Sequence, residues 1–304
     1  IDVNKMSKTV PTGTDAGVIT AEAAEKTGLA PSTHIVSISH DQVSAAIGAG
    51  AFDSSVAVDG AGTVECVTPI YDSIPDIDAM YDGYFSYVIP GKYVAYAFSY
   101  TGGALIQWCV DNLAKDEKRA AADRDLSVNE YLEKKYATER GEENPSNLLI
   151  LPHFAGAATP YMDTGSKGAI LGLTTDTTVA DIYRGCMEGV VYEMLVNTSA
   201  LKKSGCKFKK LNATGGGARS GEWMQMKADM LNVPITALKT VDAGTVGSAM
   251  LTGIATGVFK DLNDAAEHMV EETVEYLPRK EMHEKYMHIF ERYAKVYQAV
   301  RPLV

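Results

Sequence analysis

The stretch that decides the fold is Leu211-Asn212-Ala213-Thr214-Gly215-Gly216-Gly217-Ala218. Its first four residues are typical of a buried β-strand, and the glycines lead into a helix marked by Trp223, Met226 and Met230. Glycines let a flat or charged ligand approach the main chain closely. A strand that passes through a glycine loop into a helix predicts an α/β architecture with a ligand site at that loop.

Similar glycine clusters recur along the chain. Gly62 and Thr63 lie in the turn of a predicted β-hairpin, and Gly102-Gly103 opens a predicted helix with free N–H groups. Glycine turns and helix N-termini suit a polyphosphate. Each cluster by itself is more simply read as a tight turn, and none matches a P-loop or a Rossmann motif.

Asp41 is the candidate for acid–base chemistry. It follows the alternating strand Ile35-Val36-Ser37-Ile38-Ser39 and starts a short predicted helix as an N-cap or first-turn residue. A carboxylate at such a junction can accept a hydroxyl proton during phosphoryl transfer. Taken alone, however, the residue is more simply explained as a plain helix cap. His40 beside it could be a ligand or a base, but a lone histidine is more often structural. No spacing of histidine, cysteine and carboxylate residues indicates a metal site built from side chains alone.

Composition narrows the class of protein. The 304 residues, 46% of them hydrophobic and 22% charged, predict one or two soluble domains. A net charge of −11 argues against nucleic acid or an anionic membrane as the main partner. No apolar run approaches the roughly 20 residues of a membrane helix, and no signal peptide is recognised. With four widely spaced cysteines interpreted as reduced, these features predict a cytoplasmic protein.

Two further segments carry predictions about local structure. Residues 115–147 are strongly charged with a helical pattern, which predicts a solvated surface excursion. The last helix is predicted to be continuous, with five apolar residues on one face: Tyr286, Phe290, Tyr293, Tyr297 and Val300.

The order of the motifs resembles that of the FGGY carbohydrate kinases, which include glycerol kinase and xylulokinase. The resemblance covers nearly the whole chain. It implies an actin-like (ribonuclease H-like) α/β fold, with a mixed sheet flanked by helices and an incomplete first domain. The matching segments are Ser39-His40-Asp41-Gln42, Gly62-Thr63, residues 103–108, 159–163 and 168–173, the helix with Arg184 and Glu188-Gly189, residues 215–218 and residues 244–249.

This resemblance implies an ATP- and Mg²⁺-dependent kinase that phosphorylates a sugar, either a ketose such as a pentulose or hexulose, or a polyol. Asp41 would be the catalytic base and Gln42 would touch the sugar. The implied nucleotide-binding residues are Gly62, Thr63, Gly103, Gln107, Gly216 and Ser220. Val64 occupies a position that is usually small in the family, and Ser220 replaces an asparagine common in glycerol kinases.

Residues 1–50 are interpreted as the end of the sugar-binding domain and residues 51–304 as the ATP-binding domain. The family's D-x-G-[ST] phosphate loop does not precede Asp41, and Gly13-Thr14-Asp15, the nearest string, lacks the strand before it. We therefore expect a truncated form that is inactive by itself.

Two alternatives stay open. One is a non-catalytic actin-like module for nucleotide binding or assembly. The other is a complete protein whose partner chain supplies the missing domain. An exposed strand edge within residues 1–50 also favours self-association into a homo-oligomer.

Overall fold

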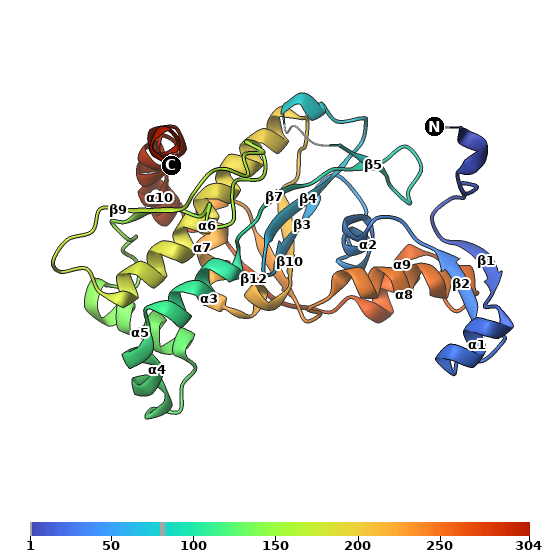
Figure 1. The fold of residues 1–304 in the computed structure, drawn as a ribbon, viewed down its shortest axis with the longest axis horizontal. Coiled ribbons are helices and arrows are strands. Elements are labelled where there is room, and N and C mark those ends of the chain that lie inside the picture. The colour runs from blue at the N-terminus through green and yellow to red at the C-terminus, as the bar shows by residue number, and fades with distance from the viewer. Residues whose placement is uncertain (1, 80–82) are drawn as a thin grey trace.

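A mixed β-sheet forms the centre of the molecule (Figure 1). The structure is a computed structural model that describes residues 2–79 and 83–304. In sheet order, the strands are β12 (Glu272–Tyr276), β11 (Ile235–Leu238), β10 (Lys210–Thr214), β3 (Val56–Ala61), β4 (Glu65–Tyr71), β6 (Tyr93–Val94) and β5 (Phe85–Ser86), and β7 (Ala97–Ser99) also pairs with β4. Strands β3, β10 and β11 are parallel, and the other pairings are antiparallel.

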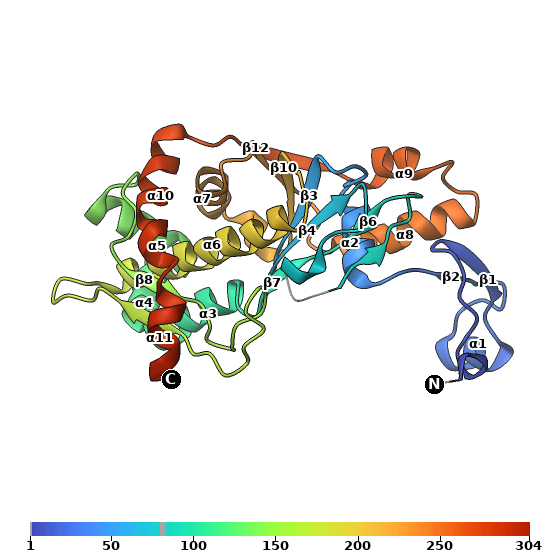
Figure 2. The ribbon, with the colours of Figure 1, turned by 90° about the horizontal axis from the view of Figure 1, so that it is seen from above.

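Helices cover both faces of this sheet (Figure 2). One face carries α3 (Gly103–Asn112), α6 (Val179–Lys203) and α7 (Gly221–Leu231), and the other carries α2 (Asp41–Gly48), α8 (Ala243–Ala255) and α9 (Leu262–Met269). The alternation of side chains along a strand explains the two cores. On β3, Ala57 and Ala61 pack toward α6 and α7, whereas Val58 packs toward α2 and α8. The predicted α/β architecture is confirmed.

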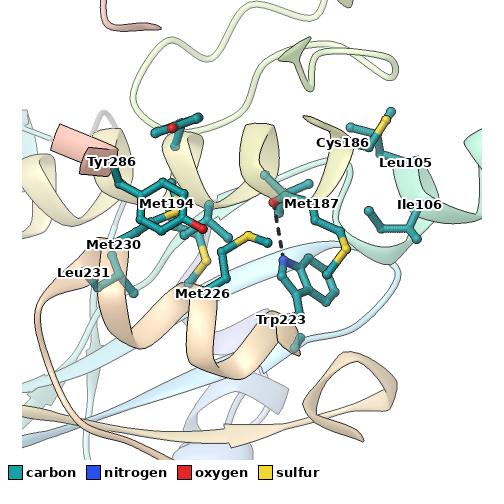
Figure 3. Close-up of a cluster of buried hydrophobic side chains, with 14 of the residues drawn as sticks. Leu105, Ile106, Cys186, Met187, Met194, Trp223, Met226, Met230, Leu231 and Tyr286 are labelled. Atoms are coloured by element: carbon teal, nitrogen blue, oxygen red, sulfur yellow. Dashed lines mark hydrogen bonds between the residues drawn. The ribbon is translucent and has the colours of Figure 1, made fainter. Parts of the chain in front are cut away.

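The core between α6 and α7 is built from methionines around Trp223 (Figure 3). Met187 and Met194 of α6 face Met226 of α7, and all three are buried. The indole Nε1 of Trp223 donates a hydrogen bond to the carbonyl of Met187 at 3.4 Å. Because methionine fills irregular gaps, this layer packs α7 closely against α6.

Helices α2 and α8 pack closely enough for their backbones to touch. A Cβ atom on Gly48 would lie 1.9 Å from the carbonyl oxygen of Ala243, and one on Gly247 would lie 1.9 Å from that of Ser44. Only glycine fits at these two positions. The start of α2, which carries Asp41, is therefore held against the sheet and α8.

A small unit precedes α2 and lies at one end of the molecule, beyond α8 (Figure 1). It contains the 3₁₀ turn η1 (Val3–Lys5), the antiparallel strands β1 (Thr14–Val18) and β2 (His34–Ser37), and the helix α1 (Ala21–Thr27). Helix α1 ends at Gly28, whose φ is 74°. Strand β1, however, begins at Thr14, so Gly13-Thr14-Asp15 starts a strand instead of following one.

Two predictions about the other segments need correction. The charged excursion forms α4 (Lys115–Ala122) and α5 (Val128–Arg140), but Leu132 and Tyr136 are buried in the main core and are not solvated. The last helix is broken after Tyr293 into α10 (Lys280–Tyr293) and α11 (Val296–Val300). Further elements are the 3₁₀ turns η2 (Ile77–Ala79) and η4 (Arg301–Leu303) and the paired strands β8 (Leu149–Leu151) and β9 (Ala169–Leu171).

Candidate functional site

The candidate site lies where the three parallel strands end. Because β3, β10 and β11 are parallel, their carboxyl ends share one edge of the sheet. Strand β3 is followed by a turn at residues 62–64, which we call the phosphate turn. Strand β10 is followed by residues 215–217, the glycine loop, and β11 leads to the start of α8. The structure thus brings together segments that are far apart in sequence.

The phosphate turn is docked onto the start of α3. The N–H groups of Gly103 and Ala104 donate to the carbonyls of Gly62 and Thr63 at 2.9 and 3.1 Å, and that of Gly102 also donates to Thr63 at 2.9 Å. The prediction that Gly102-Gly103 offers free N–H groups is therefore wrong, because carbonyl oxygens of the turn already occupy them.

Other backbone amides at this edge remain available to a ligand. Within the described residues, the N–H groups of Thr63, Val64 and Gly216 donate no hydrogen bond. All three residues are also exposed. An anion is the natural partner for exposed amides of this kind.

The glycine loop packs against the phosphate turn. A Cβ atom on Gly215, which has a φ of 96°, would lie 2.5 Å from the carbonyl oxygen of Ala61. One on Gly217 would lie 2.7 Å from the Trp223 ring. At Gly216, the start of the 3₁₀ turn η3 (Gly216–Arg219), an added Cβ would meet nothing within 4 Å. Gly215 and Gly217 are explained by packing, whereas Gly216 faces open space.

Asp41 and Gln42 lie beside the strand that leaves the phosphate turn. Asp41 is the first residue of α2, and the Gln42 side chain lies 3.3 Å from the Thr68 hydroxyl and 3.5 Å from the Cys66 sulfur on β4. Burial raises the pKa of Cys66 to about 12, and the charge of Asp41 contributes a smaller increase. The carbonyl of Asp41 also faces the start of α8, 3.8 Å from a Cβ built on Gly244.

His40 caps α2 and is held by aromatic rings. Its ring is stacked on Phe85 and on Tyr96, with centroid distances of 4.5 and 5.7 Å. Its Nδ1 lies 3.2 Å from the amide of Gln42 and 3.0 Å from a carboxylate oxygen of Asp41. These contacts agree with a structural role and fix the start of the helix.

The two remaining predicted residues already have partners. The exposed Gln107, one turn beyond Gly103 on α3, donates to the Asp111 carboxylate at 2.8 Å. Ser220 caps α7 by accepting from the amide of Trp223, and its hydroxyl donates to Glu133 at 3.1 Å. Sequence reasoning missed Glu133, which lies on α5 in the segment expected to be solvated.

Glu133 belongs to a partly buried group of charges. Burial, and then the charge of Glu222, raises its pKa to about 7. Glu222 is paired with Arg184 of α6, whose guanidinium also donates to Glu188 and to the Tyr286 hydroxyl at 2.8 Å. This network joins α5, α6, α7 and α10 around Ser220.

Other features of the described residues do not coincide with this site. A cavity of about 1060 Å³ lies between α5 and α10, and none of the predicted nucleotide or sugar residues lines it. In the described ranges, no three His, Cys, Asp or Glu side chains are grouped so that they could hold a metal ion. None of the helices there is long and apolar enough to cross a membrane.

Comparison with known families assigns the chain to a class. The model of the FGGY family of carbohydrate kinases, C-terminal domain, matches residues 60–256, which contain the phosphate turn, the start of α3 and the glycine loop. The chain belongs to this family. Its mixed sheet with helices on both faces is the actin-like ATPase fold.

Individual relatives extend the match beyond these residues. The xylulose kinase of Staphylococcus epidermidis is 26% identical over 285 residues, which cover 93% of this chain and 54% of the relative. The glycerol kinase of Aquifex aeolicus is 31% identical over 223 residues, or 72% of this chain and 42% of the relative. The structure of a xylulose kinase from Lactobacillus acidophilus aligns with a TM-score of 0.84 at 23% identity, covering 99% of this chain and 59% of that one. The chain thus spans about half the length of these proteins.

Proposed function

We propose that this chain forms the ATP-binding side of a kinase that phosphorylates a hydroxyl group of a ketose or a polyol. The observation that carries the proposal is the contact of the phosphate turn with both the start of α3 and the glycine loop, at the edge of the sheet beside α2. A xylulose kinase and a glycerol kinase among the relatives support a ketose or a polyol as the substrate class.

The exposed amides of the phosphate turn and Gly216 would hold phosphate oxygens. Since the N–H groups at the start of α3 are occupied, the role of Gly103 would be to fix the turn by close approach. Gln107 and Ser220 would lie toward the nucleoside. Mg²⁺ would enter with ATP and neutralise charge on its phosphates.

Asp41 would act as the general base. Its carboxylate would accept the hydroxyl proton as the sugar oxygen forms a bond to the γ-phosphorus and the bond from that phosphorus to the bridging oxygen of ADP breaks. Gln42 would orient the sugar. We assign residues 1–50 to the sugar side and residues 51–304 to the nucleotide side.

Because the chain spans about half of its relatives, we expect these 304 residues alone to bind nucleotide and to turn over sugar very slowly or not at all. Positioning supplies much of the catalysis in phosphoryl transfer, so half of a binding cleft is not enough. A turnover on the order of 1 per second by the isolated chain would contradict this expectation.

Nucleotide binding can be tested by calorimetric titration of the chain with ATP. Gly216→Asp would place a carboxylate at the exposed position of the glycine loop, and we expect it to weaken ATP binding about tenfold or more, because like charges repel. Ala299→Asp adds the same charge on the exposed side of α11 and serves as the control. ATP binding that is equal in both variants would argue against the assigned site.

A further inference from the structure

A lysine is buried directly behind the phosphate turn. Lys227 of α7 has no exposed surface, and its ammonium lies 2.8 Å from Asp59 Oδ2 and 2.7 Å from Glu65 Oε1. Both carboxylates are also buried. The ammonium also lies 4.7 Å from the centre of the Trp223 ring. We call Lys227, Asp59 and Glu65 the buried triad.

The three members come from the elements that carry the phosphate turn and the glycine loop. Asp59 lies on β3, two residues before the end of that strand, and Glu65 is the first residue of β4. Strand alternation turns both side chains toward α7. Helix α7 follows the glycine loop, separated from it only by residues 218–220. One ammonium therefore ties both strands of the hairpin to the helix behind the loop.

The charges of the buried triad do not balance without a proton. Two carboxylates face one ammonium, and within the described residues Asp59 Oδ1 and Glu65 Oε2 have no hydrogen-bond partner. Burial, and then the charge of Asp59, raises the pKa of Glu65 well above its usual range. One proton shared between the two carboxyl groups would satisfy both oxygens and leave the triad neutral.

Stability by itself is a poor reason for such an arrangement. Burying charged groups costs free energy, and well-packed apolar residues in place of a buried ion pair are often neutral or stabilising. Apolar residues, however, would not provide a directional link. The ion pair links Glu65, which is next to the phosphate turn, to the helix that follows the glycine loop.

We propose that Lys227 is a positioning residue that holds the phosphate turn in register with the glycine loop, so that the phosphates and the nucleoside bind to one rigid frame. The inference rests on the function proposed above. Loosening the triad should weaken binding of the phosphate chain and leave binding of adenosine unchanged.

The test compares Glu65→Ala with Glu65→Gln. Both leave Lys227 paired with Asp59, so no unbalanced charge is buried. The alanine removes the link to β4, whereas the glutamine oxygen can still accept from the ammonium. We expect Glu65→Ala to weaken the binding of ATP and of inorganic tripolyphosphate at least fivefold, and Glu65→Gln to weaken it much less. Adenosine should bind to the parent chain and to both variants with the same affinity.

If Glu65→Ala fails to fold, the triple variant Lys227→Met/Asp59→Asn/Glu65→Gln replaces it, because it leaves no charge in the core. The inference would be overturned if the folded variant bound tripolyphosphate as tightly as the parent chain, or if it lost as much affinity for adenosine as for tripolyphosphate. In either case, ATP binding by the parent chain would still uphold the proposed function. A parent chain that binds neither ATP nor tripolyphosphate would instead overturn the proposed function, and the inference with it.

Discussion

The amide of Gly103 donates a hydrogen bond to the carbonyl of Gly62 at 2.9 Å, and a Cβ atom at position 103 would lie 2.9 Å from that same oxygen. A helix start and a hairpin turn that are 41 positions apart (103 minus 62) therefore form one rigid unit. The start of the helix shapes the turn, and within the described residues the amides of Thr63 and Val64 donate no hydrogen bond.

Gly103→Ala should disturb this unit without removing any polar group. The new methyl group would press on the Gly62 carbonyl and displace the turn, at a cost of about 1–3 kcal/mol. We expect a lower melting temperature and weaker ATP binding, measured by calorimetry. Ala104→Gly, one residue further on, adds no atoms and provides the control. Wild-type ATP affinity in Gly103→Ala would contradict the close approach.

Asp41→Asn tests the proposed base. In any longer form of the protein that phosphorylates a sugar, we expect kcat to fall about 10²–10⁴-fold, because the amide cannot accept the hydroxyl proton. ATP affinity should stay within a factor of about two, since Asp41 is assigned no contact with the nucleotide. Asp116→Asn, an exposed aspartate on α4, is the matched control. Full turnover by Asp41→Asn would favour a binding module over a kinase.

The raised pKa of Glu133 predicts that the stability of the folded chain depends on pH. Its pKa is raised to about 7 in the folded chain, from an ordinary value of 4.5, so the folded state holds this proton more tightly than the unfolded state. The stabilisation is complete below pH 4.5 and is lost as the pH rises through about 7. Glu133→Gln should flatten this dependence.

The measurement is urea unfolding of both proteins between pH 5 and 8. The stability of the wild type relative to Glu133→Gln should decrease by about 2 kcal/mol over this range, allowing for partial exposure. Glu65, Glu188 and Glu222 also have raised pKa values, but they are present in both proteins and largely cancel. A constant difference would show that Glu133 does not titrate as described.

Gly247→Ala tests the contact between α2 and α8. Alanine in the middle of an exposed helix normally stabilises it by up to about 1 kcal/mol relative to glycine. Here the added Cβ would lie 1.9 Å from the carbonyl of Ser44, so overpacking should dominate and destabilise the chain by about 3 kcal/mol. Denaturant unfolding measures whether the substitution lowers or raises the free energy of unfolding. A stabilised variant would show that the two helices can separate at little cost.

Much of the fold was predictable because its signals are local. Strand alternation, helix periodicity and glycine identified the β3–β4 hairpin, α3, α7 and the loop before α7. Strand β12 and helix α9 were missed: most residues of β12 are exposed and two are glutamates, so its sequence lacks the usual pattern of a strand.

The candidate site was predictable only in part, because its decisive contacts are long-range. Asp41 and the glycine clusters could be named from sequence. The hydrogen bond donated by the Gly103 amide, however, depends on the position of the phosphate turn, which is formed by a distant part of the sequence. Lys227 looks like an ordinary helix lysine until tertiary packing buries it beside Asp59. Likewise, Glu133 is separated from Ser220 by 87 positions.

The contact at Gly48 and Gly247 has a consequence for motion. Many enzymes close loops or domains around their substrates. With its backbone pressed against α8, we expect α2 to move together with α8. A base at Asp41 would then keep a fixed position relative to the start of α8 while the residues of the sugar side that precede α2 move.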